Sequence, residues 1–82
     1  MFYMYILQSE LVDRYYIGST DDISRRLSDH NAGNTRSTKP FRPWKVVYTE
    51  TYSTLIEARK RERQVKAWKS REFMANTLGL KT

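Results

Sequence analysis

The apolar residues of this chain fall into three short runs and two helical stripes. Positions 2–7 are apolar or aromatic at every residue, whereas a strand covered on one face alternates, so this run predicts an interior strand. Residues 9–14, which are mostly polar and turn-like, separate it from a second strand over residues 15–18, and the two predict a hairpin. A third strand is expected over residues 44–49.

A first helix is predicted over residues 21–31, between the second and third strands. Thr20 is the expected N-cap, and Gly33 offers the left-handed conformation that ends many helices. Residues 34–43 follow as an irregular, basic segment with two prolines. This segment is either a contact for a phosphate backbone or a solvated connector.

A second helix is predicted from a capping box that starts at Thr54, and it continues through residue 68. Its buried stripe has a carboxylate, Glu62, near the centre, where an unpaired charge would be costly. Glu62 therefore needs a cation, a metal ion or a cluster of donors. A last short helix is expected over residues 69–78, with Phe73 and Leu78 docking it.

The predicted order is strand, strand, helix, strand, helix, helix. The simplest arrangement is an α/β (α+β) sandwich in a single domain over residues 1–82, with a small antiparallel sheet flanked by helices. Arg61 flanks a helix face that should be ordinary solvated surface. Trp44 and Trp68 are expected in the core rather than as stacking platforms for bases.

The charge of the chain points to a polyanionic partner. Fifteen basic against nine acidic residues give a formal charge of +6 over 82 residues, which favours DNA or RNA. The chain has no cysteine, so it has no disulfide or thiolate metal site, and a cytoplasmic location is expected. The apolar run at residues 2–7 is too short for a membrane span or a signal peptide.

Five residues whose side chains could take part in a reaction occur beside apolar neighbours: Tyr5, Tyr16, Arg26, His30 and Glu62. Together they suit metal-assisted phosphodiester hydrolysis, because one carboxylate can hold a hydrated cation and an arginine suits phosphate oxygens. Plainer interpretations stay open. The tyrosines could be cross-strand packing, Arg26 and His30 could lie at the rim of the stripe, and Arg26 with Glu62 could be a structural ion pair.

Two short motifs stand on the first two predicted strands, Tyr3-Met4-Tyr5 and Tyr16-Ile17-Gly18, and two helical segments follow at residues 22–31 and 57–62. Their order and spacing resemble the GIY-YIG nuclease superfamily, which includes the nuclease domain of the bacterial excision-repair endonuclease, intron homing endonucleases and short single-domain proteins. The second signature of that family is intact as Tyr16-Ile17-Gly18, and the first lacks its leading glycine. Residues 22–31 match the family helix and residues 57–62 the later glutamate segment. The segment 62–68 resembles the short members, and the resemblance covers residues 2–71.

The resemblance implies a three-stranded antiparallel sheet and a role for each residue. Tyr5 would be the general base or its relay, with His30 accepting the proton, and Tyr16 would position the water or phosphate. Arg26 would neutralise charge in the transition state. Glu62 would hold one divalent cation, Mg²⁺ or Mn²⁺, while a serine stands at position 19, where some relatives carry a lysine.

The favoured function is therefore a divalent-metal-dependent endonuclease for DNA or RNA, in repair or processing. A non-catalytic nucleic-acid-binding module on the same fold is the runner-up, and a protein-interaction domain is third. Sequence preference is expected to be weak, or to be supplied by a protein partner. The residues expected to contact phosphates are Arg25, Arg36, Lys39, Arg42 and Lys66.

Overall fold

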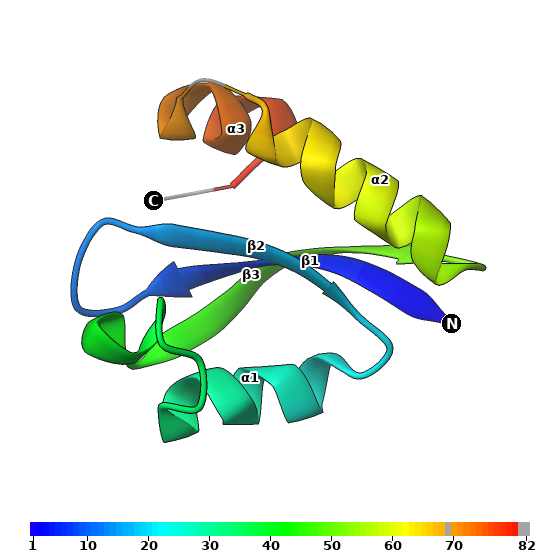
Figure 1. Ribbon diagram of the computed structural model, residues 1–82. Helices are drawn as coiled ribbons and strands as arrows, with labels where there is room; N and C mark the ends of the chain where they lie inside the picture. The colour runs from blue at the N-terminus through cyan, green and yellow to red at the C-terminus, as the bar shows by residue number, and fades with distance from the viewer. Residues whose placement is uncertain (69, 81–82) are drawn as a thin grey trace.

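The computed structural model describes residues 1–68 and 70–80 and shows a three-stranded antiparallel sheet with helices on both faces (Figure 1). The central strand β1 (Phe2–Ser9) pairs with β2 (Tyr15–Thr20) on one side and β3 (Trp44–Tyr52) on the other. The helices are α1 (Ile23–Ala32), α2 (Leu55–Lys66) and α3 (Arg71–Leu78), and a short 3₁₀ helix, η1 (Lys39–Phe41), precedes β3. The predicted fold class and the order of strands and helices are confirmed.

The side chains of β1 alternate between two cores, one on each face of the sheet. Met4 and Ile6 pack with Val65 on the face covered by α2 and α3. Tyr5 and Leu7 point to the other face, which α1 covers. All four side chains are buried because β1 is central and both faces are covered, so the prediction of an interior strand is confirmed.

The start of α1 differs from the prediction. Asp22, not Thr20, is the N-cap, and its Oδ1 accepts a hydrogen bond of 3.0 Å from the backbone N–H of Arg25. Thr20 is paired with Tyr3 at the end of β2, so it is still part of the strand. The end of α1 is as predicted, because Gly33 takes the left-handed conformation with φ of 84°.

Helix α2 begins as predicted and ends earlier. Thr54 caps it by accepting a hydrogen bond of 3.2 Å from the backbone N–H of Glu57. The helix ends at Lys66 rather than at residue 68. No helix in the described part of the chain is long and apolar enough to cross a lipid bilayer.

Helix α3 docks against the core through Leu78, as predicted, but not through Phe73. Met74 and Ala75 are buried, whereas Phe73 is 54% exposed and lies with its ring edge-on to Trp68. Phe73 lies one position before Met74, so it points away from the core when Met74 points into it. The expected helix began at Lys69, which lies outside the described residues.

The helical stripe predicted that Arg61 flanks a solvated surface, and this prediction is wrong. Its guanidinium forms hydrogen bonds of 2.9 and 3.2 Å with the two carboxylate oxygens of Glu50 on β3. Glu50 also accepts hydrogen bonds from the hydroxyls of Tyr48 and Tyr52, both of 2.5 Å. Trp68 packs against the core beneath Arg61, which lies 5.4 Å from its ring centroid.

Trp44 is a core residue, as predicted. It is 4% exposed, and its indole N–H donates a hydrogen bond of 2.9 Å to the backbone carbonyl of Thr38. This contact fixes the segment between α1 and β3 against the sheet, and it thereby places Thr38 next to the end of α1.

Candidate active site at the edge of strand β2

The glycine of the Tyr16-Ile17-Gly18 signature makes room for a buried tyrosine. Gly18 lies opposite Tyr5 in the sheet, and a Cβ atom on Gly18 would be 2.6 Å from the Tyr5 hydroxyl oxygen. Any larger residue would therefore push the Tyr5 ring away. Tyr5 is 1% exposed, so its ring packs in the core and its hydroxyl lies beneath α1.

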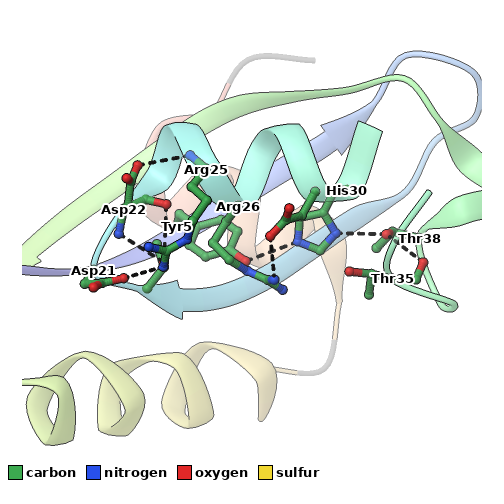
Figure 2. A network of polar contacts seen from close by, with 10 residues as sticks. Tyr5, Asp21, Asp22, Arg25, Arg26, His30, Thr35 and Thr38 are labelled. Atoms are coloured by element: carbon green, nitrogen blue, oxygen red, sulfur yellow. Dashed lines mark hydrogen bonds and ion pairs between the residues drawn. The ribbon is translucent and has the colours of Figure 1, made fainter. Parts of the chain in front are cut away.

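Tyr5 is the first member of a buried chain of hydrogen bonds (Figure 2). Its hydroxyl is 3.2 Å from Nε2 of His30, and Nδ1 of His30 is 2.8 Å from Oγ1 of Thr38. The Thr38 hydroxyl in turn donates to the carbonyl of Thr35 at 3.3 Å. A hydroxyl has one proton, so we infer that Nδ1–H of His30 donates to Thr38 and Nε2 accepts from Tyr5.

Burial keeps the Tyr5–His30 pair uncharged. Desolvation raises the pKa of Tyr5, and the neighbouring Arg26 guanidinium offsets part of that increase. Desolvation also lowers the pKa of His30, and the Arg26 charge lowers it further. At neutral pH the imidazole is therefore neutral, which is the form that can accept a proton.

Arg26 and Tyr16 complete the group on the α1 side of the sheet. The side chain of Arg26 is 31% exposed, pairs with Asp29 at 3.3 Å and lies beside the Tyr5 hydroxyl. The ring of Tyr16 lies over His30 with 4.6 Å between centroids. Tyr16 is half-buried. The structure thus brings the four predicted catalytic residues together.

Glu62 approaches the same edge strand from the other face of the sheet. Its Oε1 accepts a hydrogen bond of 2.6 Å from the hydroxyl of Ser19 on β2, and its Oε2 lies 2.5 Å from the Nζ of Lys66. The Glu62 side chain is 18% exposed. The alternative of a structural ion pair between Arg26 and Glu62 is wrong, because each has a different partner.

The donor set around Glu62 suits only a largely hydrated cation. The described part of the chain holds no cluster of three or more histidine, aspartate or glutamate side chains that could bind a metal ion. Mg²⁺ keeps several waters and is commonly held by one or two carboxylates together with substrate phosphates. Glu62 fits that pattern if the substrate completes the coordination, although Lys66 now occupies one of its oxygens.

The predicted phosphate contacts divide into two groups. Arg25 and Lys66 flank the candidate active site, one on each helix, and Arg25 is paired with Asp21 at 2.5 Å. Arg42 instead turns back to the chain and donates to the carbonyl oxygen of Lys39 at 3.0 Å. Lys39 and Arg36 are exposed on the segment that follows α1, and their contact with phosphates stays a prediction.

A hollow of about 350 Å³ adjoins the site, and we call it the arginine hollow. Its lining includes Ser19, Asp21, Arg25, Arg26, Leu55 and Arg59. Arg59 was not among the residues predicted to form the site. Its spacing could have indicated it, because residues three apart on a helix share a face and Arg59 lies three residues before Glu62.

Comparison with known proteins places the chain in a family. The model of the GIY-YIG catalytic domain matches residues 1–76. The chain therefore belongs to the GIY-YIG family. A GIY-YIG catalytic domain is of the nuclease type and implies a nucleic-acid substrate.

The relatives within this family are similar small proteins. The chain is 43% identical over 54 residues to a UPF0213 protein of Staphylococcus epidermidis, covering 65% of this chain and 66% of that protein. It is 47% identical over 49 residues to one of Listeria welshimeri, covering 58% and 54%. A UPF0213 protein of Staphylococcus haemolyticus is 36% identical over 67 residues, 80% of each chain. The first two matches span less than two thirds of the relative's length.

A solved structure shows the same fold. The solution NMR structure of a UPF0213 protein from Bacillus halodurans has a TM-score of 0.55 and 29% sequence identity, covering 94% of this chain and 83% of that one. The names of these relatives specify no reaction and no metal ion.

Proposed function

We propose that this chain is a divalent-metal-dependent endonuclease that hydrolyses phosphodiester bonds in DNA or RNA. The observation that carries the proposal is the hydrogen bond from the Tyr5 hydroxyl to Nε2 of His30, beneath Arg26 and beside the edge strand that Glu62 reaches from the other face. A proton acceptor, a phosphate-binding cation and a carboxylate are the parts that this reaction requires.

Arg26 has the role of binding the phosphate. Its planar guanidinium is permanently charged and can donate two hydrogen bonds to phosphate oxygens. Its partial exposure leaves it open to a ligand, and its partner Asp29 is at 3.3 Å. As the attacking oxygen adds to phosphorus, Arg26 would stabilise the extra negative charge that develops on the phosphate oxygens.

Tyr5 and His30 have the role of removing a proton from the attacking water. The water oxygen forms the new bond to phosphorus while its proton passes through the Tyr5 hydroxyl to Nε2 of His30. The bond from phosphorus to the leaving sugar oxygen breaks, and that oxygen takes a proton from solvent. The burial of Tyr5 favours a relay over direct contact with bulk water. Tyr16, which is more exposed, would position the water or the phosphate.

Glu62 would hold one Mg²⁺ or Mn²⁺ ion, which when bound would polarise the phosphate and stabilise the leaving oxygen. Ser19 fixes the orientation of the carboxylate by donating to Oε1. Lys66 neutralises the carboxylate in the absence of the ion and is expected to move to a phosphate when substrate binds. A role in DNA repair, a cytoplasmic location and a protein partner stay predictions.

A non-catalytic nucleic-acid-binding module is the second candidate. The observation that favours it is the complete satisfaction of Glu62, since Ser19 and Lys66 together occupy both carboxylate oxygens without a metal ion. Binding alone needs no divalent cation at Glu62, and the two candidates therefore differ in metal dependence.

A single-turnover cleavage assay tests the proposal. It uses single-stranded, duplex and branched DNA and the matching RNA, each with Mg²⁺, with Mn²⁺ and with EDTA. We expect cleavage of at least one substrate that EDTA abolishes and that Glu62→Gln strongly reduces, because glutamine keeps the shape and loses the charge. Binding without cleavage under every condition would overturn the endonuclease proposal in favour of the binding module.

A further inference from the structure

The arginine hollow lies where two helices begin. Strands β2 and β3 both run antiparallel to β1, so both end at the same end of the sheet, and α1 and α2 start there (Figure 1). The hollow is lined from α1 by Arg25 and Arg26 and from α2 by Leu55 and Arg59. It therefore joins the two faces of the sheet around the end of the edge strand.

The three arginines of the hollow differ in how far their charges are neutralised. Arg25 is paired with Asp21 at 2.5 Å, and Arg26 is paired with Asp29 at 3.3 Å. Arg59 is exposed, and within the described residues it has neither an ion pair nor a hydrogen bond from its side chain. Its positive charge is thus available to a ligand.

Arg59 is placed beside the candidate active site but not within it. It lies three residues before Glu62, so the two side chains share one face of α2. Ser19 connects them, because it lines the hollow and donates its hydroxyl hydrogen to Glu62. A phosphate in the hollow would lie between Arg59 and Arg26, next to the phosphate that is cleaved.

We propose that Arg59 binds the phosphate adjacent to the one that is cleaved, and so holds the nucleic-acid backbone across the end of β2. This proposal rests on the nuclease function proposed above. The positive ends of the α1 and α2 dipoles both point to the hollow and favour an anion there. Arg59 contacts substrate but no reacting atom, so it acts on binding in the ground state and the transition state alike.

The test is a salt titration of binding in EDTA, where no metal-dependent cleavage occurs. The probes are a short fluorescent single-stranded DNA and its duplex, and fluorescence anisotropy gives the affinity. Arg59→Gln should weaken binding several-fold and reduce the slope of log affinity against log salt by about 0.7 for the single strand or 0.9 for the duplex. Arg59→Lys, which keeps the charge, should retain the slope.

The matched control is Lys60→Gln, which removes one exposed charge from the neighbouring position without touching the hollow. Its slope should stay close to that of the unmutated protein. In a cleavage assay on the best substrate, Arg59→Gln should raise KM and leave kcat unchanged.

Two results would contradict the proposal, and they can be told apart. If the unmutated protein binds with a steep salt dependence but Arg59→Gln behaves like Lys60→Gln, Arg59 has no such role and the nuclease proposal stands. If the unmutated protein binds neither probe at low salt, the nucleic-acid function itself fails and the role of Arg59 fails with it.

Discussion

The two faces of the sheet carry similar polar residues in opposite arrangements. On the face covered by α2, the carboxylate of Glu50 accepts hydrogen bonds from Tyr48 and Tyr52 and pairs with Arg61, so the network is closed on itself. On the face covered by α1, the chain that starts at Tyr5 passes through His30 and lies beneath Arg26, beside the arginine hollow.

The chemistry of the acceptor separates the two networks further. A phenol and a carboxylic acid differ by about six in their ordinary pKa values, whereas a phenol and an imidazolium differ by about 3.5. Burial and the bond to Glu50 raise the pKa of Tyr52 to about 12. Burial acts to raise the pKa of Glu50, but its hydrogen-bond donors and the charge of Arg61 outweigh burial and lower that pKa. Tyr52 therefore holds its proton. Tyr5 also holds its proton at rest, because burial raises its pKa and lowers that of His30, but its acceptor is a neutral imidazole rather than a carboxylate that already has several donors.

The two groups differ in whether their charges are matched internally, which separates a structural network from a candidate site. The Glu50 network contains a cation, a carboxylate and two tyrosines, yet every charge is matched within it. The group around Tyr5 has a proton acceptor at one end and a partly exposed cation at the other. The Glu50 network should therefore determine the stability of the fold, and the group around Tyr5 should determine the rate of the reaction.

The largest expected effect is that of Arg26→Ala. The single-turnover cleavage rate should fall by about a hundred- to a thousandfold, the cost of losing one preorganised donor to the transition-state charge. Binding should also weaken, because Arg26 contacts the phosphate. Arg25→Ala is the control on the same helix, since Arg25 is exposed and paired with Asp21. Equal rate losses for both variants would place Arg26 among general phosphate contacts.

Glu50→Gln should have the opposite profile. The change removes the negative charge of the carboxylate that accepts hydrogen bonds from Arg61 and two tyrosines. Because these bonds weaken, the free energy of unfolding should fall by about 2 kcal/mol. The cleavage rate, measured where the variant is still folded, should not change. Urea unfolding and single-turnover kinetics on the same preparation check this. A folded variant that has lost its cleavage rate would show that the two faces are coupled.

Lys66→Met should strengthen the binding of Mg²⁺ to the free protein, by up to about tenfold. The ammonium lies 2.5 Å from Oε2 of Glu62, so its removal frees that oxygen and takes away a like charge, which is worth about 1 kcal/mol at about 4 Å in water. Isothermal titration calorimetry measures the affinity, with Lys60→Met as the control. An unchanged affinity would mean that Glu62 is not the metal ligand.

The smallest effect concerns the pH dependence of stability. Because the folded state lowers the pKa of His30 below its ordinary value of 6.5, the unfolded chain binds that proton more readily. The stabilisation is complete above pH 6.5 and is lost as the pH falls toward the lower pKa of the folded state. The urea midpoint of unfolding should decrease as the pH falls through this range, and the midpoint of His30→Gln should decrease less steeply. Parallel profiles would indicate that His30 is not desolvated.

Features set by local chemistry could be predicted from the sequence. Gly33 ends α1 and Thr54 caps α2 because each acts on its own neighbours in the chain. The interior position of β1 followed from its uninterrupted apolar run. The clustering of Tyr5, Tyr16, Arg26 and His30 was implied by the resemblance to the GIY-YIG superfamily, and the structure brings these side chains together.

Features set by long-range pairing could not be predicted. Thr20 lost its capping role because it pairs with Tyr3 in the sheet. Arg61 pairs with Glu50, which lies eleven residues earlier on β3, and the pattern of residues along a helix cannot predict a partner on a strand. Arg59 gained its place in the hollow only because two strands end together and bring α1 and α2 to one end of the sheet.

A comparison of Tyr5→Phe with Tyr48→Phe tests the central claim most directly. Each change removes one hydroxyl from a hydrogen-bonded tyrosine, one in the Tyr5–His30 pair and one in the closed Glu50 network. The measurement is the single-turnover cleavage rate, beside a binding isotherm for the same substrate. We predict a fall of roughly a hundredfold or more for Tyr5→Phe with its affinity unchanged, and no change in rate for Tyr48→Phe. A Tyr5→Phe protein that cleaves as fast as Tyr48→Phe would contradict the account.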